Sequence, residues 1–373
     1  MATSTSSAGN SGGDGARAQY VIPFEAAAAE PVARIGGKCA GLAALVGASA
    51  PVSPGFAVTT DAFLEMMAVD GLAKEIKGIL ARLDVNDVRN EAHVSQDIGE
   101  AIARRAMPSH IAAAIRSAYA RLGTGSTVDA AVAVRSSGTA EDLPDASFAG
   151  QGDTYLSIVG GDTVVDKVKK CWASLYTARA ISYRAQCRIG HLDVQMAVAV
   201  QVMVNARSAG VAMTLDPSNG DRSKIIIEST WGLGETLVSG EVTPDHFMID
   251  KVMLMPITRR ISVKDHELVS DPTTRAAVRC KIQGERRAQP SVTDDELQSI
   301  ARVVKAIERH FGSPQDIEWA IDNTRTESGG VVILQSRPET VWSMKKTQSA
   351  RANYGSGTMG VLDTLIAPLL PKK

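Results

Sequence analysis

The chain has 373 residues, which is enough for about two or three packed subdomains. Its residues are 44% hydrophobic and 22% charged, as in ordinary globular proteins, which excludes a disordered, collagen-like or disulfide-scaffold chain. Forty Lys and Arg against 41 Asp and Glu give a net charge of -1, so no overall field favours nucleic acid or an anionic membrane surface.

The first 18 residues contain mainly Ser, Gly, Thr and Ala. They predict a flexible tail, because they lack the basic and apolar segments of a secretory signal. The four cysteines form no C-x-x-C pair, a pattern typical of reduced, buried thiols. The sequence has no uninterrupted apolar run of about 18 residues either. We therefore expect a cytoplasmic protein that binds neither membrane nor nucleic acid.

The first half of the chain alternates turns with helical periods. The turn Gly36-Gly37-Lys38 opens a predicted helix of small residues through Leu45. A second helix is predicted after Pro108, ending at Gly123. A short strand then ends in Arg135 and leads into the expected loop Ser136-Ser137-Gly138-Thr139.

Residues from about Thr163 to Arg184 return to a helical period, with an apolar stripe from Val165 to Tyr176. From Gln195 the pattern becomes strand-like, separated by Gly, Pro, Asn and Asp clusters. The predicted strands are Met196–Val204, Gly210–Leu215, Lys224–Glu228 and His246–Asp250.

The last helix has the clearest boundaries in the sequence. Thr293 and Glu296 form a capping box at its start, and Gly312 is the predicted stop. Two strands follow, 316–322 and 331–337, joined by a turn long enough for an antiparallel hairpin. Such a hairpin would bring Glu318 near Gln335.

These residues suit nucleotide phosphoryl transfer, which needs cations and backbone N–H groups around phosphates and hard oxygen ligands for magnesium. Lys38 and Arg135 would supply the cations, and Glu318 with Gln335 the oxygens. The expected loop would cover the phosphates with donors from Ser137, Gly138 and Thr139. Neither a Walker phosphate loop nor a G-x-G-x-x-G motif occurs, which argues against P-loop and Rossmann enzymes.

An ordered series of sequence words resembles the nucleotide-binding part of the phosphoenolpyruvate synthase and pyruvate phosphate dikinase family, over roughly residues 20 to 343. The words are Gly36-Gly37-Lys38, Pro54–Thr59, Ala133–Ser137, Ala140–Gln151, Val200–Val204, Ser208–Ala212, Glu228–Glu235, Asp316–Ala320 and Leu334–Pro338. Gly138 and Gly41 stand where Ala and Ser are commoner in the family.

The resemblance implies an α+β, ATP-grasp fold with ATP in the cleft between two lobes. It implies a tail at 1–18, an N-terminal lobe at 19–190, a C-terminal lobe at 191–343 and a tail at 344–373 that docks on a partner or folds back on its own lobe. By position, Lys38, Arg135 and Arg337 match phosphate-contacting, catalytic residues, and Glu318 and Gln335 match magnesium ligands. Gln201 and Met203 match the segment that lines the adenine, and Glu228 matches a residue beside the ribose.

The six histidines lack the family's Thr-Ser-His or Ser-His context for a phosphate-carrying histidine. The expected function is therefore an ATP-binding subunit that transfers a phosphoryl or pyrophosphoryl group from Mg-ATP to a histidine on a separate subunit, which also holds the acceptor site. The leading hypothesis is a phenylphosphate synthase-like enzyme that phosphorylates phenol and in which this chain is inactive alone. The alternatives are the front fragment of a phosphoenolpyruvate synthase or rifampicin phosphotransferase, and a non-catalytic nucleotide-binding module.

Overall fold

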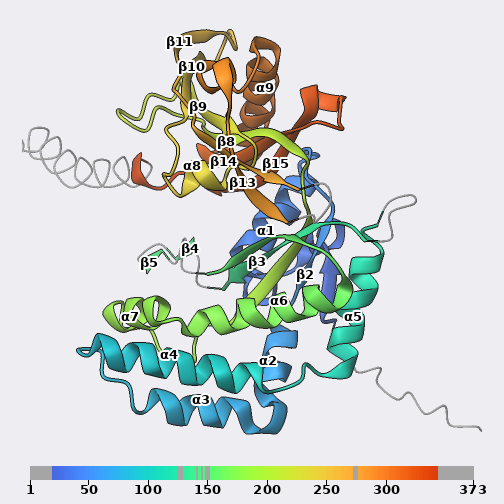
Figure 1. Ribbon diagram of the computed structural model, residues 1–373, viewed down its shortest axis with the longest axis vertical. Helices are drawn as coiled ribbons and strands as arrows, with labels where there is room; N and C mark the ends of the chain where they lie inside the picture. Colours follow the sequence, from blue (N-terminus) through green and yellow to red (C-terminus); the bar gives the residue numbers. More distant parts are fainter. Residues whose placement is uncertain are drawn as a thin grey trace, which may run out of the picture.

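The computed structural model describes residues 19–123, 129–139, 142–143, 146–147, 152–271 and 276–342. The predicted tails at 1–18 and 344–373 lie outside the described residues, as does most of the word Ala140–Gln151. Within the described part, two antiparallel sheets occupy opposite halves of the molecule, and helices flank each of them (Figure 1). The predicted two-lobed α+β architecture is confirmed.

The first sheet has five strands in the order β1-β2-β7-β3-β6. Its central strand β7 consists of small and apolar residues apart from Gln201, as expected where helices cover both faces. The bounds are β1 Val21–Pro23, β2 Gly55–Val58, β3 Val132–Gly138, β6 Thr154–Ile158 and β7 Met196–Val202. A separate two-residue pair comprises β4 Asp142–Leu143 and β5 Ala146–Ser147.

Helices cover the two faces of this sheet unequally. One helix, α1 Val32–Gly47, packs against one face through a small cluster that includes Cys39, Leu42 and Ala199. The other face carries the largest core, beneath the remaining helices of the lobe (Figure 1). These helices are α2 Thr60–Ala68, α3 Leu72–Leu80, α4 Val88–Ala103, α5 Ser109–Ala120, α6 Gly161–Ala173 and α7 Ala178–Gln186.

Three expectations for this lobe need correction or refinement. The segment of helical period from about Thr163 to Arg184 is divided at Thr177, whose side chain caps α7. The expected loop Ser136–Thr139 is strand as far as Gly138, because these residues pair with Met196–Val198 of β7. The same pairing puts β7 in the first sheet, so the predicted lobe boundary at residue 190 falls too early. A strand's own residues do not identify the sheet that it joins.

The second sheet has six strands in the order β11-β10-β9-β8-β14-β15. Helix α9, Asp294–Phe311, covers one face and begins with the predicted capping box. Gly312 follows it in the left-handed conformation, with φ 70°. The bounds are β8 Ala206–Met213, β9 Lys224–Trp231, β10 Asp245–Asp250, β11 Pro256–Arg260, β14 Gln315–Asp322 and β15 Val331–Pro338. A one-turn helix, α8, spans Glu235–Val238.

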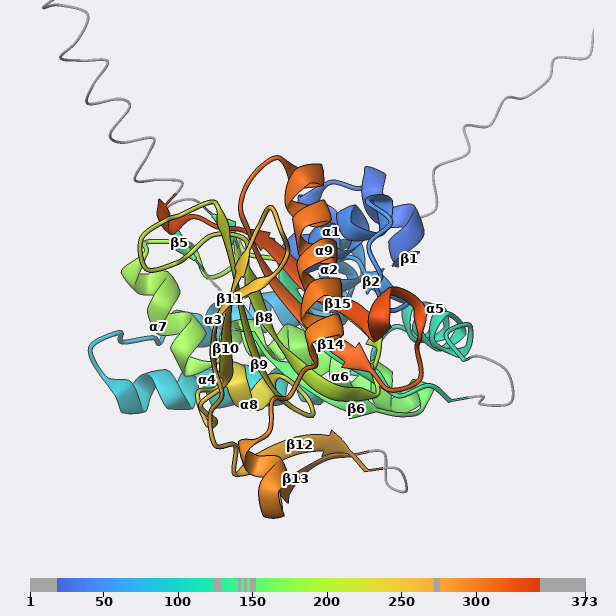
Figure 2. The same cartoon turned by 90° about the horizontal axis from the view of Figure 1, so that it is seen from above.

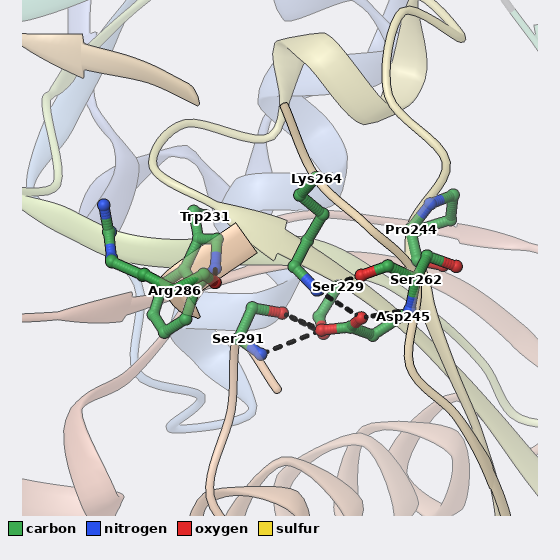
Figure 3. Close-up of polar contacts among 8 residues, drawn as sticks. All are labelled: Ser229, Trp231, Pro244, Asp245, Ser262, Lys264, Arg286 and Ser291. Carbon is green, nitrogen blue, oxygen red and sulfur yellow. Dashed lines mark hydrogen bonds and ion pairs between the residues drawn. The ribbon is translucent and has the colours of Figure 1, made fainter. Parts of the chain in front are cut away.

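A hairpin of β12 His266–Ser270 and β13 Ala277–Lys281 projects from one flank of this lobe (Figure 2). The segment before it is held by a buried ion pair in which Lys264 Nζ lies 2.5 Å from Asp245 Oδ1, both side chains being fully buried. Ser291 donates to the other carboxylate oxygen from its backbone N and its hydroxyl, both at 2.8 Å (Figure 3). Both oxygens of the buried carboxylate therefore have donors, as a buried charge requires.

Helix α1 joins the two lobes. Its residue Leu45 belongs to the core under α9, whereas Leu42 belongs to the cluster on the first sheet. After the helix, Val52 bridges in parallel to Ile333 of β15, whose N donates to Pro51 O at 2.7 Å. The two sheets therefore share one packed element.

Candidate functional site

Cross-strand register aligns three predicted site residues along one row of the second sheet. Glu228 of β9 pairs with Val211 of β8, Val211 pairs with Glu318 of β14, and Glu318 pairs with Gln335 of β15. Cross-strand partners have side chains on the same face, and neighbouring strands lie about 4.8 Å apart. Glu318 and Gln335 are therefore neighbours, and Glu228 lies about 10 Å from Glu318, two strands away.

Arg135 of the first sheet joins this row from the opposite lobe. Its Nη2 donates to Glu318 Oε2 at 3.1 Å and to Gln335 Oε1 at 3.0 Å, and its Nη1 donates to Leu334 O at 3.1 Å. The side chain is 14% exposed, which strengthens charge-assisted hydrogen bonds relative to those in water. The structure thus brings together one predicted phosphate-contacting cation and both predicted magnesium ligands.

Arg337 lies on the same hairpin, directly opposite Asp316, with 3.8 Å between its Nε and Asp316 Oδ2. Burial raises the pKa of Asp316, and Glu339 raises it further, whereas Arg337 opposes the shift. Asp316 is not among the predicted site residues, although its spacing of two residues from Glu318 puts both side chains on one face of the strand.

The turn that carries Lys38 is locked against the end of β3. Gly36 has φ 72°, and a Cβ there would lie 2.0 Å from Ser137 O. The fully buried Ser137 hydroxyl donates to Ile35 O at 3.0 Å and accepts from Cys39 N at 3.1 Å. These bonds hold the chain on both sides of Lys38, so the hydroxyl shapes the turn.

The rest of the expected loop is likewise committed to backbone pairing. Gly138 is the last residue of β3 and pairs with Met196. Thr139 donates from its N and its Oγ1 to Gln195 O at 3.1 and 3.2 Å. Of the residues predicted to cover phosphates flexibly, Ser137, Gly138 and Thr139 are therefore fixed by the sheet.

Gln201 lies on the same face of the first sheet as Arg135, because Ala133 and Arg135 pair with Gln201 and Ala199 of β7. It is 3% exposed, and its Nε2 has no hydrogen-bond partner among the described groups. A buried amide without a partner costs about 1–3 kcal/mol, which makes it a candidate ligand contact. Met203 is half-buried, and its N donates to Ala131 O at 2.9 Å.

A small apolar patch adjoins the row of Glu228, Glu318 and Gln335 on the second sheet. Ala209, Ala320 and Val332 form it with Val204, the residue that follows Met203. Thr230 pairs with Ala209, is fully buried, and has a hydroxyl without a hydrogen-bond partner in the described part of the chain. Sequence reasoning missed Thr230, because a Thr inside a strand is ordinary.

A cavity of about 210 Å³ opens elsewhere, at the start of β8. Its lining contains none of the predicted site residues. Two arginines dominate it, and both already pair with carboxylates, Arg207 with Glu296 and Arg286 with Glu267. The lining comprises Asn205, Ala206, Arg207, Glu267, Val269, Ser270, Arg286 and Asn323.

Hard oxygen ligands fit magnesium, and the row offers the carboxylate of Glu318 and the amide oxygen of Gln335. Over the described residues, no group of three or more His, Cys, Asp and Glu side chains gathers as a metal centre. A magnesium ion held here would thus take its remaining ligands from phosphates and water, as is usual for this ion. None of the helices in the described ranges is both long and apolar enough to cross a membrane.

Residues 32–357 match the family model of the pyruvate phosphate dikinase AMP/ATP-binding domain. Phosphoenolpyruvate synthase of Aeropyrum pernix is 44% identical over 340 residues, covering 84% of this chain and 42% of the relative. A probable phosphoenolpyruvate synthase of Methanothermobacter thermautotrophicus is 42% identical over 328 residues, covering 86% and 46%. Phosphoenolpyruvate synthase of Pyrococcus furiosus is 37% identical over 367 residues, covering 88% and 45%. The chain spans less than half the length of each of these relatives.

Proposed function

The chain belongs to the family of pyruvate phosphate dikinase AMP/ATP-binding domains, with its ATP-grasp-like α+β fold, and on that premise we propose that it transfers a phosphoryl or pyrophosphoryl group from Mg-ATP to a histidine. The histidine lies beyond the matched residues, on a separate subunit or on a further domain. AMP and phosphate leave, because the histidine takes one phosphoryl group while a water molecule cleaves the second phosphoanhydride bond of ATP. The observation that carries the proposal is the cluster of Arg135, Glu318 and Gln335 between the lobes.

Each lobe contributes different groups to the proposed site. Lys38, Arg135 and Arg337 bind and orient the phosphates, while Glu318 and Gln335 hold magnesium, which neutralises charge on the transferred group. Ser137 acts through Lys38, because its hydroxyl holds the turn on both sides of that residue.

The nucleoside end of ATP is proposed to lie along the rest of the row. Glu228, about 10 Å from Glu318, contacts the ribose. The adenine lies beside Gln201 and Met203, over the apolar patch that contains Ala209. The buried amide of Gln201 supports this arrangement, since a hydrogen bond from its Nε2 to the base would satisfy it.

For the final acceptor, the relatives favour pyruvate over phenol. All three compared relatives carry the name phosphoenolpyruvate synthase. The names therefore support the alternative hypothesis, that this chain is the N-terminal part of a phosphoenolpyruvate synthase, over the leading hypothesis of a phenol-phosphorylating enzyme. Because the chain spans less than half of each relative, we expect it to bind ATP but to turn over negligibly without the histidine-bearing part.

Calorimetry with Mg-ATP tests nucleotide binding, and Arg135→Ala is expected to weaken it strongly. A tagged chain purified from its native cells, incubated with ATP labelled at the β or γ phosphate, tests the transfer. The expected product is acid-labile histidine phosphate that pyruvate discharges as phosphoenolpyruvate. Discharge by phenol instead would restore the phenol hypothesis, and absence of nucleotide uptake would refute the proposed function altogether.

A further inference from the structure

The two oxygens proposed to hold magnesium are the two that Arg135 binds. Nη2 lies 3.1 Å from Glu318 Oε2 and 3.0 Å from Gln335 Oε1, so a single nitrogen lies in the wedge between them. Magnesium ligands lie about 2.0–2.1 Å from the ion. A cation that approached both oxygens from the side of Nη2 would collide with the N–H groups of Nη2. Magnesium bound there would therefore have to displace the guanidinium from these two oxygens.

Resting on the proposed function, we propose that Arg135 is an exchangeable latch: its guanidinium holds Glu318 and Gln335 in position until Mg-nucleotide arrives, then moves from these oxygens to the phosphates. The exchange keeps every charge paired. Magnesium replaces the guanidinium on the carboxylate, and phosphate oxygens replace the carboxylate on the guanidinium.

Burial makes the exchange depend on both ligands together. The Arg135 side chain is only 14% exposed, so a metal ion without nucleotide would displace a buried guanidinium that has no new anion to bind. Nucleotide supplies that anion. Metal and nucleotide therefore assist each other, and thermodynamic linkage requires the coupling to be the same in both directions.

Arg337 provides a matched control, because it puts an equal charge on the same hairpin without touching these two oxygens. It lies opposite Asp316, 3.8 Å from that carboxylate, and its side chain is 50% exposed. Loss of a general positive charge should raise the affinity for a divalent cation in both Arg135→Met and Arg337→Met. Only Arg135→Met also removes a group that competes directly with the cation for the oxygens of Glu318 and Gln335.

The test measures Mn²⁺ binding to the full chain by loss of its electron paramagnetic resonance signal, with and without a non-hydrolysable ATP analogue. Without nucleotide, Arg135→Met should bind Mn²⁺ about tenfold more tightly than the natural chain, equivalent to about 1.4 kcal/mol. Arg337→Met should gain only about twofold, as expected for a screened, exposed charge. In Arg135→Met the nucleotide should add much less to Mn²⁺ affinity than it does in the natural chain.

Unchanged or weaker Mn²⁺ binding by Arg135→Met would overturn the latch, as would an equal gain in Arg337→Met. If Arg135→Met fails to fold by circular dichroism, Arg135→Lys takes its place, since lysine keeps the charge but cannot reach all three acceptors in the same way. It too should bind Mn²⁺ more tightly than the natural chain, and no gain would refute the latch. Failure of the natural chain to bind Mn²⁺ with the analogue would instead refute the proposed function, so the two failures are distinguishable.

Discussion

Replacing Ser137 by alanine tests whether the buried hydroxyl positions Lys38. The substitution removes the bond to Ile35 O at 3.0 Å and the bond from Cys39 N at 3.1 Å. At about 1 kcal/mol for each neutral hydrogen bond, the turn loses about 2 kcal/mol. If that loss appears wholly in phosphate binding, the affinity for Mg-ATP falls by up to about 30-fold. Calorimetry should show this fall for Mg-ATP and little change for adenosine, which has no phosphate.

A double-mutant cycle separates positioning from general damage. In a Lys38→Ala background, Ser137→Ala should cost little further Mg-ATP affinity, because the group that it positions is already gone. Ser208→Ala is the matched control, since its buried hydroxyl has no hydrogen-bond partner in the described ranges. Fully additive losses, or equal losses for adenosine and Mg-ATP, would refute the positioning role.

Three further predictions follow. Gly36→Ala should weaken Mg-ATP binding more than removal of any single hydrogen bond does. Residue 36 has φ 72°, and the added Cβ would lie 2.0 Å from the backbone oxygen of Ser137. Calorimetry that shows unchanged binding would contradict this. Asp245→Asn should destabilise the chain by about 3–5 kcal/mol in denaturant unfolding, because it leaves the buried Lys264 charge without its partner; a loss below about 1 kcal/mol would contradict this. The Ser218 side chain holds the pKa of Asp216 below its ordinary value of 3.8. The ionised carboxylate therefore stabilises the fold above pH 3.8, and this stabilisation is lost as the pH falls through the lower pKa of the folded state. Asp216→Asn should therefore lower the unfolding free energy at neutral pH and not in strong acid, and an equal deficit at both would contradict this.

The sequence was sufficient to predict the structure where local signals and tertiary packing agree. The capping box at Thr293 and the alternation around Glu318 fixed helix α9 and the hairpin, and with them the pairing of Glu318 and Gln335. The sequence was insufficient where the conformation of a segment depends on pairing with residues far away along the chain. Ser136 and Ser137 have the composition of a loop, but pairing with β7 makes them strand. The contact between Arg135 and the second lobe joins residues about 200 positions apart, which no local pattern encodes.

Helix α1 has one further consequence, because it is anchored in both cores and the bridge from Val52 to Ile333 fastens its exit. Wide separation of the two lobes would detach helix α1 from one of the two cores, and full exposure of either Leu45 or Leu42 would cost about 1.5–3 kcal/mol. We therefore expect the two lobes to behave as one stiff unit. In the proposed transfer, the part that carries the histidine, and not these two lobes, therefore covers the distance to the acceptor.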